Sequence, residues 1–445
     1  MSQVFRRRLL GWEYPEIVRG EGVYLYDSEG RQYLDGSGGA LVVTVGHGVA
    51  EIAQAIGEQA ARIAYVHGTQ FATDPLETLA ADLAKRAPVE DARLYLVSGG
   101  SEATETSIKL ARQYHLAKGA GGRYKVIFRW PSYHGSSLGA LSVSGRFLLR
   151  RSFAPLLVEM PHIPAPYAYR CRLPGCGPVC SLECARALEA KILEEGPETV
   201  AAFIGEPVIG ASGGALVPPP EYFRIVRETC DRYGVLFIAD EVMCGLGRTG
   251  QWFAIEHWGV CPDILTTGKG LTSGYVPGGA LLVKGEIVEA LKAGGGFPHG
   301  FTYSHHPVVA AAGLAVLRYS ERLHLVERAG TMGAYLQERL GKLVDLPTVG
   351  EIRGLGLMAG VEIVRDRETK LPYPPEHRMA QSIQREAFKR GLVVYLSEGH
   401  VDGAGDLLML GPPLVIEREQ IDDLVARLYQ SIDSAAATDS SLRSE

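Results

Sequence analysis

Residues 235–240 read VLFIAD and run directly into residues 241–250, EVMCGLGRTG. The apolar run predicts a strand buried on both faces of a sheet, and it ends on a carboxylate, Asp240. The glycines that follow have the G-x-G-x-x-G spacing that is typical of dinucleotide-binding loops. The stretch therefore suggests two hypotheses: the glycines cradle NAD, or Asp240 itself is the functional group.

The position of the glycines argues against a dinucleotide. A dinucleotide-binding loop has its glycines directly at the end of the strand, where they open a helix that points at the pyrophosphate. Here residues 240–244 intervene, and residues 251–263, QWFAIEHWGVCPD, have no clean helical period. The first unit of the fold should also carry such a loop, whereas this one lies past mid-chain. We therefore favour Asp240 as the functional group.

Asp240 has a candidate cationic partner further along the chain. Ligands of open α/β sheets bind beyond the carboxyl ends of the strands, and a carboxylate buried there is costly unless it is paired. Residues 262–268, PDILTTG, predict another strand, and Lys269 follows it between two glycines. A desolvated lysine among small residues is a candidate Schiff-base nucleophile. Pyridoxal phosphate (PLP) requires this pair, because a lysine holds its aldehyde and a carboxylate keeps its pyridine nitrogen protonated.

PLP also requires a phosphate site and an aromatic platform. The strand at 94–98, LYLVS, leads into a glycine turn and a helix, so that Gly100 and Ser101 can present N–H groups and a hydroxyl to an anion. An ordinary helix cap is the alternative interpretation. Tyr133 and His134 follow the strand at 124–130 and offer a ring face, although a tyrosine in a loop can equally serve packing alone.

Strands and helices alternate from about residue 51 to residue 325, and the strands are near-continuous apolar runs. This order predicts an α/β fold whose large α/β/α domain, residues 51–325, has a mostly parallel sheet. Residues 326–445 predict a smaller α+β domain with strands near 349–364, 391–396 and 406–410. We expect the strands of residues 1–50 to join it, and residues 434–445 to form a disordered tail.

Composition excludes several classes of protein. The chain has 445 residues, 46% hydrophobic and 22% charged, and a net charge of −6 with both signs mixed along it. These values predict a globular protein that binds neither nucleic acid nor an anionic membrane. No apolar run reaches about 18 residues and no signal peptide opens the chain, so we expect a soluble cytoplasmic protein.

Four of the seven cysteines lie close together, at Cys171, Cys176, Cys180 and Cys184. Four cysteines in so short a segment could bind zinc, but the usual paired C-x2-C spacing is absent. We therefore expect reduced thiols in a surface insertion and no metal.

Seven motifs in this order resemble those of the class-III PLP-dependent aminotransferases of fold type I, in particular the omega- or amine-transaminases. The resemblance covers about residues 20–428. The motifs are VSGGSEATE (97–105), SYHGSSLGALSVSG (132–145), GEPVIGASGG (205–214), FIADEVMCGLGRTG (237–250), PDILTTGKGLTSGYVPGGA (262–280), GFTYSHHPVVAAAG (300–313) and DLLMLGPPLVI (406–416).

The resemblance implies roles for the matching residues. Lys269 would hold the cofactor and carry a proton between substrate and cofactor, and Asp240 would bind the pyridine nitrogen. The other cofactor-binding residues would be Gly100 and Ser101 at the phosphate, Tyr133 and Val242 on the two ring faces, His134 beside them, Glu206 near the substrate, and Thr302, which would reach the phosphate of a neighbouring subunit. Thr302 therefore implies a homodimer, and GLGRTG becomes a structural turn. The implied reaction is a ping-pong transfer from an amine donor to a keto acid acceptor.

The sequence departs from this family in its substrate-binding segment. Many relatives carry an arginine shortly before the C-terminal PP, whereas no arginine lies between Arg390 and Arg418 here, and Asp402 falls near the expected place. Either another arginine or backbone donors hold the carboxylate of the acceptor, or the donor is an amine or diamine whose cation meets Glu206 or Asp402. The other candidates for the substrate pocket, each of which could instead belong to the core, are Leu41, Tyr65, Phe71 and Trp130.

The motifs report the cofactor more directly than the reaction. An aminomutase, a dialkylglycine-type decarboxylase or an epimerase on the same scaffold therefore stays open. A binding protein without catalysis is disfavoured, because Lys269 and Asp240 are both intact. We predict a homodimeric aminotransferase that takes an amine or omega-amino acid as donor and pyruvate or a similar keto acid as acceptor.

Overall fold

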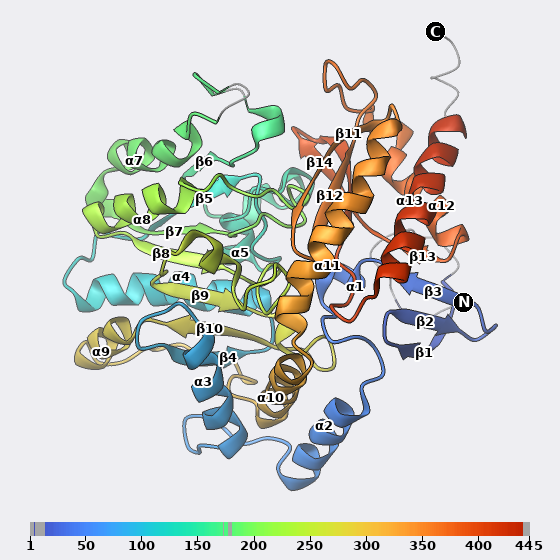
Figure 1. The fold of residues 1–445 in the computed structure, drawn as a ribbon. Coiled ribbons are helices and arrows are strands. Elements are labelled where there is room, and N and C mark those ends of the chain that lie inside the picture. Colours follow the sequence, from blue (N-terminus) through green and yellow to red (C-terminus); the bar gives the residue numbers. More distant parts are fainter. Residues whose placement is uncertain (1–3, 5–13, 172, 177–179, 439–445) are drawn as a thin grey trace.

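A seven-stranded sheet forms the centre of the larger part of the molecule. The computed structural model describes residues 4, 14–171, 173–176 and 180–438, and Figure 1 shows their path. The strand order is β4-β10-β9-β8-β7-β5-β6. The strands are β4 Arg93–Val97, β5 Lys125–Trp130, β6 His162–Pro164, β7 Val200–Gly205, β8 Leu236–Asp240, β9 Ile264–Thr267 and β10 Gly279–Val283. β10 runs antiparallel to both of its neighbours, and the other pairings are parallel, which confirms a mostly parallel sheet.

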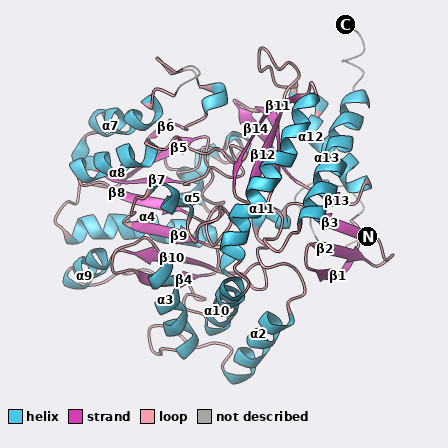
Figure 2. Cartoon of the chain, viewed as in Figure 1, coloured by secondary structure: helices cyan, strands magenta, loops and turns pink. Residues whose placement is uncertain are grey.

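Helices cover both faces of this sheet (Figure 2). Two of them lie on one face, namely α4 Gly100–Ala117 and α9 Gly285–Ala293, and three on the other, namely α3 Asp74–Arg86, α7 Glu183–Glu195 and α8 Tyr222–Tyr233. Strand β8 shows why its sequence is apolar throughout: Phe237 packs in the cluster of α7 and α8, whereas Ile238 packs in the cluster of α4. The polar end of this strand, Asp240, is therefore exceptional.

The smaller part contains two four-stranded sheets, ordered β1-β2-β3-β13 and β11-β12-β15-β14. Their strands are β1 Ile17–Glu21, β2 Tyr24–Asp27, β3 Gln32–Asp35, β11 Val349–Leu355, β12 Met358–Ile363, β13 Leu392–Val393, β14 Tyr395–Val401 and β15 Ala404–Leu410. Leu34 of β3 pairs in parallel with Leu392 of β13, so segments from the two ends of the chain build one sheet. Figure 1 shows the blue strands beside the red elements.

Three helices pack on these sheets and enclose one hydrophobic core. They are α11 Leu325–Leu340, α12 Met379–Lys389 and α13 Arg418–Thr438. The last helix corrects one expectation, because residues 434–438 are helical and Ala435 is buried in the core. Residues 439–445 of the expected tail lie outside the described residues. The single strand expected near residues 391–396 is divided between the two sheets.

Five further helices connect these parts: α1 Gly38–Leu41, α2 Ala50–Arg62, α5 Leu138–Ser142, α6 Phe147–Arg151 and α10 Pro307–Arg322. Helix α10 packs against α2 and α3. None of the helices in the described part of the chain combines the length and the hydropathy that a membrane crossing requires.

The GLGRTG stretch forms a junction between the two parts of the molecule. Arg248 is fully buried, and its guanidinium donates to the carbonyl oxygens of Leu357, Pro412 and Val43, which come from three distant segments. Burial lowers the pKa of Arg248 to about 10. The glycines therefore fold a loop around an arginine that joins three backbone segments.

Candidate active site

The carboxyl ends of the central strands meet at one edge of the sheet, where several predicted residues lie together. Asp240 ends β8, and Lys269 follows β9 after one glycine. The N-terminus of α4 lies against them, because a Cβ placed on Gly268 would be 3.5 Å from both the nitrogen of Gly100 and the Cγ1 of Val242. Groups that are distant in the sequence therefore share one site.

Asp240 is buried and hydrogen-bonded through both oxygens. Its Oδ2 lies 2.5 Å from Nδ1 of His134, whose side chain is also buried. Its Oδ1 accepts bonds from the backbone N–H of Val242 at 3.1 Å and from the hydroxyl of Thr266 at 3.2 Å. Because an ionised carboxylate only accepts, Nδ1 of His134 donates in the first bond. His134 therefore orients the carboxylate, as a fixed partner for a cationic ring nitrogen would require.

Lys269 has an uncommon backbone conformation. Its φ is 38°, a left-handed value that is costly for a non-glycine residue, and strained conformations of this kind cluster at functional sites. The residue opens a short 3-10 helix, Lys269–Leu271, and its side chain is partly exposed. Desolvation lowers the pKa of its amine to about 8, although Asp240 and Glu206 act in the opposite direction. The neutral, nucleophilic amine is therefore far more abundant near physiological pH than for an ordinary lysine.

The N-terminus of α4 carries no side-chain cap. The hydroxyl of Ser101 accepts the N–H of Ser136 at 3.1 Å, and the hydroxyl of Ser136 lies 2.8 Å from that of Tyr133. An uncapped helix end with hydroxyls beside it is suited to a phosphate. A Cβ on Gly100 would lie 2.7 Å from Cγ1 of Val242, so a larger residue would displace a side chain of the site.

The carboxylate of Glu206 is hydrogen-bonded through both of its oxygens, one of them to the backbone of Tyr133. One oxygen accepts the backbone N–H of Tyr133 at 3.0 Å, and the other accepts that of Gly210 at 2.7 Å. Burial raises the pKa of this carboxyl. Glu206 thus helps to hold the loop of Tyr133. A substrate cation would have to share its oxygens with these backbone N–H groups.

Two other predicted residues, Tyr65 and Thr302, meet on an exposed face, and a third, Phe71, is exposed as well. The hydroxyl of Tyr65 donates to the carbonyl oxygen of Thr302 at 2.7 Å. The exposed fractions of Phe71 and Tyr303 are 62% and 61%, which is high for aromatic side chains. Thr302 therefore stands beside two exposed tyrosine side chains, Tyr65 and Tyr303.

Leu41, a candidate for the substrate pocket in the sequence analysis, lies in the core and packs against the C-terminal segment. It is 1% exposed, and a Cβ on Gly411 would lie only 2.2 Å from its Cγ. Its side chain fills the space that this glycine leaves, which periodicity in the sequence does not reveal.

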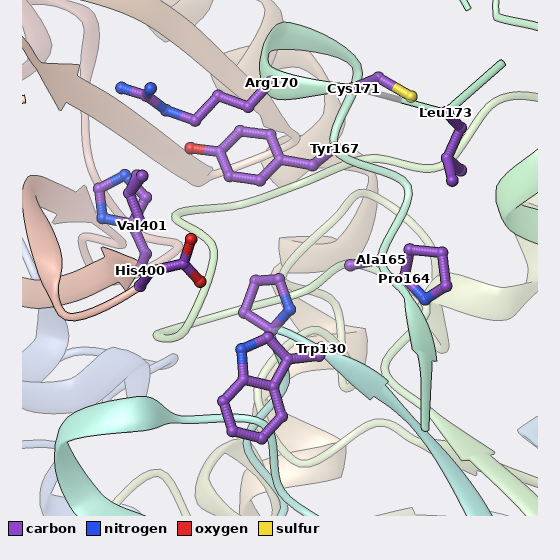
Figure 3. Close-up of a pocket in the computed structure, with 11 residues that line it drawn as sticks. Trp130, Pro164, Ala165, Tyr167, Arg170, Cys171, Leu173, His400 and Val401 are labelled. Carbon is purple, nitrogen blue, oxygen red and sulfur yellow. The ribbon is translucent and has the colours of Figure 1, made fainter. Parts of the chain in front are cut away.

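Trp130 and Asp402 line the same cavity, whose volume is about 360 Å³. Figure 3 shows Trp130 and Ala165 facing this space, with Tyr167 on a further wall and His400 opposite. Asp402 lies in the turn between β14 and β15, is exposed, and forms no ion pair with any described residue. The two residues predicted for the pocket are therefore brought together.

A buried ionic cluster forms the wall behind this cavity. Glu362 accepts bonds from Arg170 at 2.5 Å, from Arg353 at 2.7 Å and from the hydroxyl of Tyr167, and its Oε1 lies 3.3 Å from His400. Burial alone would raise the pKa of Glu362, but His400 and the arginines hold it well below its usual range. Because Arg170 already has an anionic partner, Asp402 is the unpaired charge among the described residues that line the cavity.

Arg146 is a residue of the site that the sequence analysis missed. Its guanidinium carbon lies 5.4 Å from the centre of the Tyr133 ring, and the residue is 8% exposed. The available signal was a basic residue directly after the motif SYHGSSLGALSVSG, which ends at Gly145.

The four clustered cysteines are free thiols. Within residues 14–171, 173–176 and 180–438, no group of three or more His, Cys, Asp or Glu side chains is arranged to hold a metal ion. A hydrogen bond with the hydroxyl of Ser181 lowers the pKa of Cys176 to about 7.

The lysine and the aspartate at the carboxyl edge of a mostly parallel sheet place the protein among the PLP-dependent enzymes of fold type I. Residues 13–432 match the family model of the class-III aminotransferases, and the chain belongs to this family. Its cofactor is accordingly PLP. The residues present fit this group, since they offer an amine of lowered pKa, an oriented carboxylate and an uncapped helix end.

Similar proteins cover nearly the whole chain. An uncharacterized aminotransferase of Bacillus subtilis, YodT, is 40% identical over 100% of both chains. The putrescine–pyruvate aminotransferase of Pseudomonas aeruginosa is 39% identical over 95% of this chain and 93% of its own. Among solved structures, an (S)-enantioselective omega-transaminase from Thermomicrobium roseum is 39% identical, with a TM-score of 0.91 over 98% of this chain and 96% of the other.

We expect PLP to attach to the cofactor-free protein faster as the pH rises through about 8, the pKa of the Lys269 amine. Below that pH the amine is protonated and cannot attack an aldehyde, and above it the neutral form predominates. An ordinary lysine would show this rise near 10.5. The rate is measured from the growth of visible absorbance after mixing. A midpoint closer to 10.5 than to 8 would contradict the prediction.

Proposed function

We propose that the protein transfers an amino group from an amine or omega-amino acid donor to pyruvate or a similar keto acid in a ping-pong reaction. The single observation that carries the donor class is Asp402, a carboxylate with no ion-pair partner among the described residues, on the wall of a cavity that Trp130 also lines. An ammonium group is the natural partner of a free carboxylate beside an aromatic ring.

Each half of the reaction depends on a few side chains of this chain. PLP, when bound, supplies an electron sink for the carbon that exchanges its proton. Lys269 would hold the aldehyde end of PLP and would carry the proton to and from the substrate carbon. Asp240, oriented by His134, pairs with the protonated ring nitrogen. Gly100 and Ser101 bind the phosphate at the N-terminus of α4.

The ring faces and the neighbouring subunit complete the proposed site. Tyr133 stacks on one face of the ring and Val242 presses on the other, within reach of Gly100. Thr302 reaches the phosphate of a second subunit, so that the protein acts as a homodimer. The exposed aromatic side chains beside Thr302 support this assignment, because Tyr65 and Tyr303 would be buried in such an interface.

Two relatives support a donor with a second ammonium group. One is named for putrescine and pyruvate, and another, from Halomonas elongata, is a diaminobutyrate–2-oxoglutarate transaminase that is 37% identical over 94% of this chain and 90% of its own. A donor of this kind would place its distal ammonium near Asp402 while its other amine meets the cofactor.

A panel of donors with pyruvate as acceptor tests the proposal. We expect strong turnover of diamines and of one enantiomer of 1-phenylethylamine, and weak turnover of alpha-amino acids. An aminomutase, decarboxylase or epimerase on the same scaffold would behave differently, because a mutase or epimerase needs no keto acid. Turnover of carboxylate-bearing donors alone would sink the assignment of the donor class.

Replacing Asp402 with asparagine in the same panel is expected to lower kcat/KM for putrescine by up to about fivefold, since an exposed ion pair is worth up to about 1 kcal/mol. The value for 1-aminobutane, which has the same chain and no second ammonium, should stay unchanged. An equal loss for both donors would mean that Asp402 supports the loop and does not contact the donor.

A further inference from the structure

Arg146 occupies the place from which a substrate carboxylate can be held. It is the N-cap residue of α6, and its Nη2 donates to the hydroxyl of Ser397 in β14 at 3.2 Å. The side chain thus bridges from α6 to a strand of the segment between Arg390 and Arg418, which contains no arginine.

Two glycines let α6 approach this closely. A Cβ on Gly399 would lie 2.6 Å from Cγ of Leu148, and a Cβ on Gly403 would lie 2.8 Å from Cε1 of Phe147. Both glycines have left-handed φ angles, 76° and 97°, so substitution would also strain the turn. The hairpin of β14 and β15 is therefore shaped to accept α6 and, with it, the guanidinium of Arg146.

The reacting groups lie beside this guanidinium. Its carbon is 5.4 Å from the centre of the Tyr133 ring, and its positive charge is among the influences that reach the amine of Lys269. The backbone on its N-terminal side is fixed, because a Cβ on Gly145 would lie 2.6 Å from the carbonyl oxygen of Arg129. The backbone of Arg146 is therefore held in place next to the ring of Tyr133.

The charge of Arg146 is uncompensated within the described part of the chain. The residue is 8% exposed, and the one hydrogen bond of its guanidinium to a described residue goes to a neutral hydroxyl. Arg150, one turn further along α6, instead donates to the carbonyl oxygens of Leu141, Ser142 and Ser144. A cation this buried and without an anion is unfavourable unless a ligand completes it.

We propose that Arg146 binds the carboxylate of the keto acid acceptor, in place of the arginine that the C-terminal segment lacks. This inference rests on the proposed function. A guanidinium presents parallel N–H groups that match the two oxygens of a carboxylate. The donor half and the acceptor half then use different anchors, Asp402 for a distal ammonium and Arg146 for a carboxylate.

The test compares two acceptors, pyruvate and propanal, which differ in the carboxylate. The holoenzyme is assayed with the best carboxylate-free amine, as wild type and as Arg146→Met and Arg146→Lys. We expect kcat/KM for pyruvate to fall about 10- to 100-fold in Arg146→Met, since a hydrogen bond to a charged group contributes about 1.5–3 kcal/mol. The value for propanal should stay within about twofold, and Arg146→Lys should recover part of the loss.

A matched control and a binding measurement exclude a merely structural role. Arg151→Met removes an exposed arginine of the same helix and should leave both acceptors unchanged. The dissociation constant of propionate is measured from the rise in melting temperature of the resting holoenzyme. It should increase about 10-fold or more in Arg146→Met.

Equal losses for pyruvate and propanal, or unchanged propionate binding, would overturn the inference. A wild-type enzyme that transfers no amine to pyruvate would instead overturn the proposed function. Propionate binding still reports on Arg146 in that case, so the two failures are distinguishable.

Discussion

Replacing Lys269 with alanine is expected to lower kcat by about 10³-fold or more, because one side chain both holds the cofactor and transfers the proton. Its amine is desolvated, and its backbone holds a left-handed φ of 38°. The measurement is the formation of alanine from pyruvate with the best donor, with the visible absorbance of the bound cofactor recorded in parallel.

Lys284 provides the matched control for this substitution. It follows β10 at the opposite end of the sheet and pairs with Glu90 at 3.0 Å. Lys284→Ala should therefore keep its rate and its absorbance. Small added amines should restore part of the activity of Lys269→Ala, because the truncated side chain leaves room for them. A Lys269→Ala enzyme within about tenfold of wild type would show that another group moves the proton.

Asp240→Asn is expected to lower kcat by about 10²- to 10³-fold, the usual effect of removing a preorganised electrostatic partner. An amide cannot balance a positive ring nitrogen, and it also deprives Nδ1 of His134 of its charged acceptor at 2.5 Å. The rate is measured as before, and binding of the cofactor is followed separately by its absorbance, since the phosphate site at α4 is untouched.

Asp231→Asn is a suitable control for that substitution, because Asp231 lies on the surface of α8 with an exposed side chain. It should not change kcat. If Asp240→Asn lowers kcat less than about threefold, the ring nitrogen does not depend on this carboxylate, and the proposed role of Asp240 fails.

The sheet could be predicted from the sequence because a strand that is buried on both faces is apolar along its whole length. Strand β8 is apolar up to Asp240, and its polar end alone marks the edge where ligands bind. The direction of β10 was not predicted, although the connection at residues 268–278 is shorter than the roughly dozen residues that a parallel crossover needs. The helical residues 434–438 were missed because small residues such as Ala435 can fill a core without an apolar period.

The site was only partly predictable, since its decisive contacts join distant segments. His134 and Asp240 are 106 residues apart, and Arg146 and Ser397 are 251 residues apart, so no local pattern connects them. Burial of Leu41 against Gly411 likewise depends on tertiary packing. The residue types that carry chemistry could be named from motifs, whereas their hydrogen-bond partners needed the fold.

The pairing of β3 with β13 has a consequence for how the chain folds during synthesis. Arg31 donates to the carbonyl oxygen of Lys389, a contact that spans 358 residues. The first strands therefore emerge from the ribosome long before β13 is synthesised. Their edge stays unpaired until almost the entire chain has been made. Contacts of such separation slow folding, and an open edge invites pairing with other chains. We expect refolding from denaturant to end with the docking of these strands, and chaperones to raise the yield of active protein during expression.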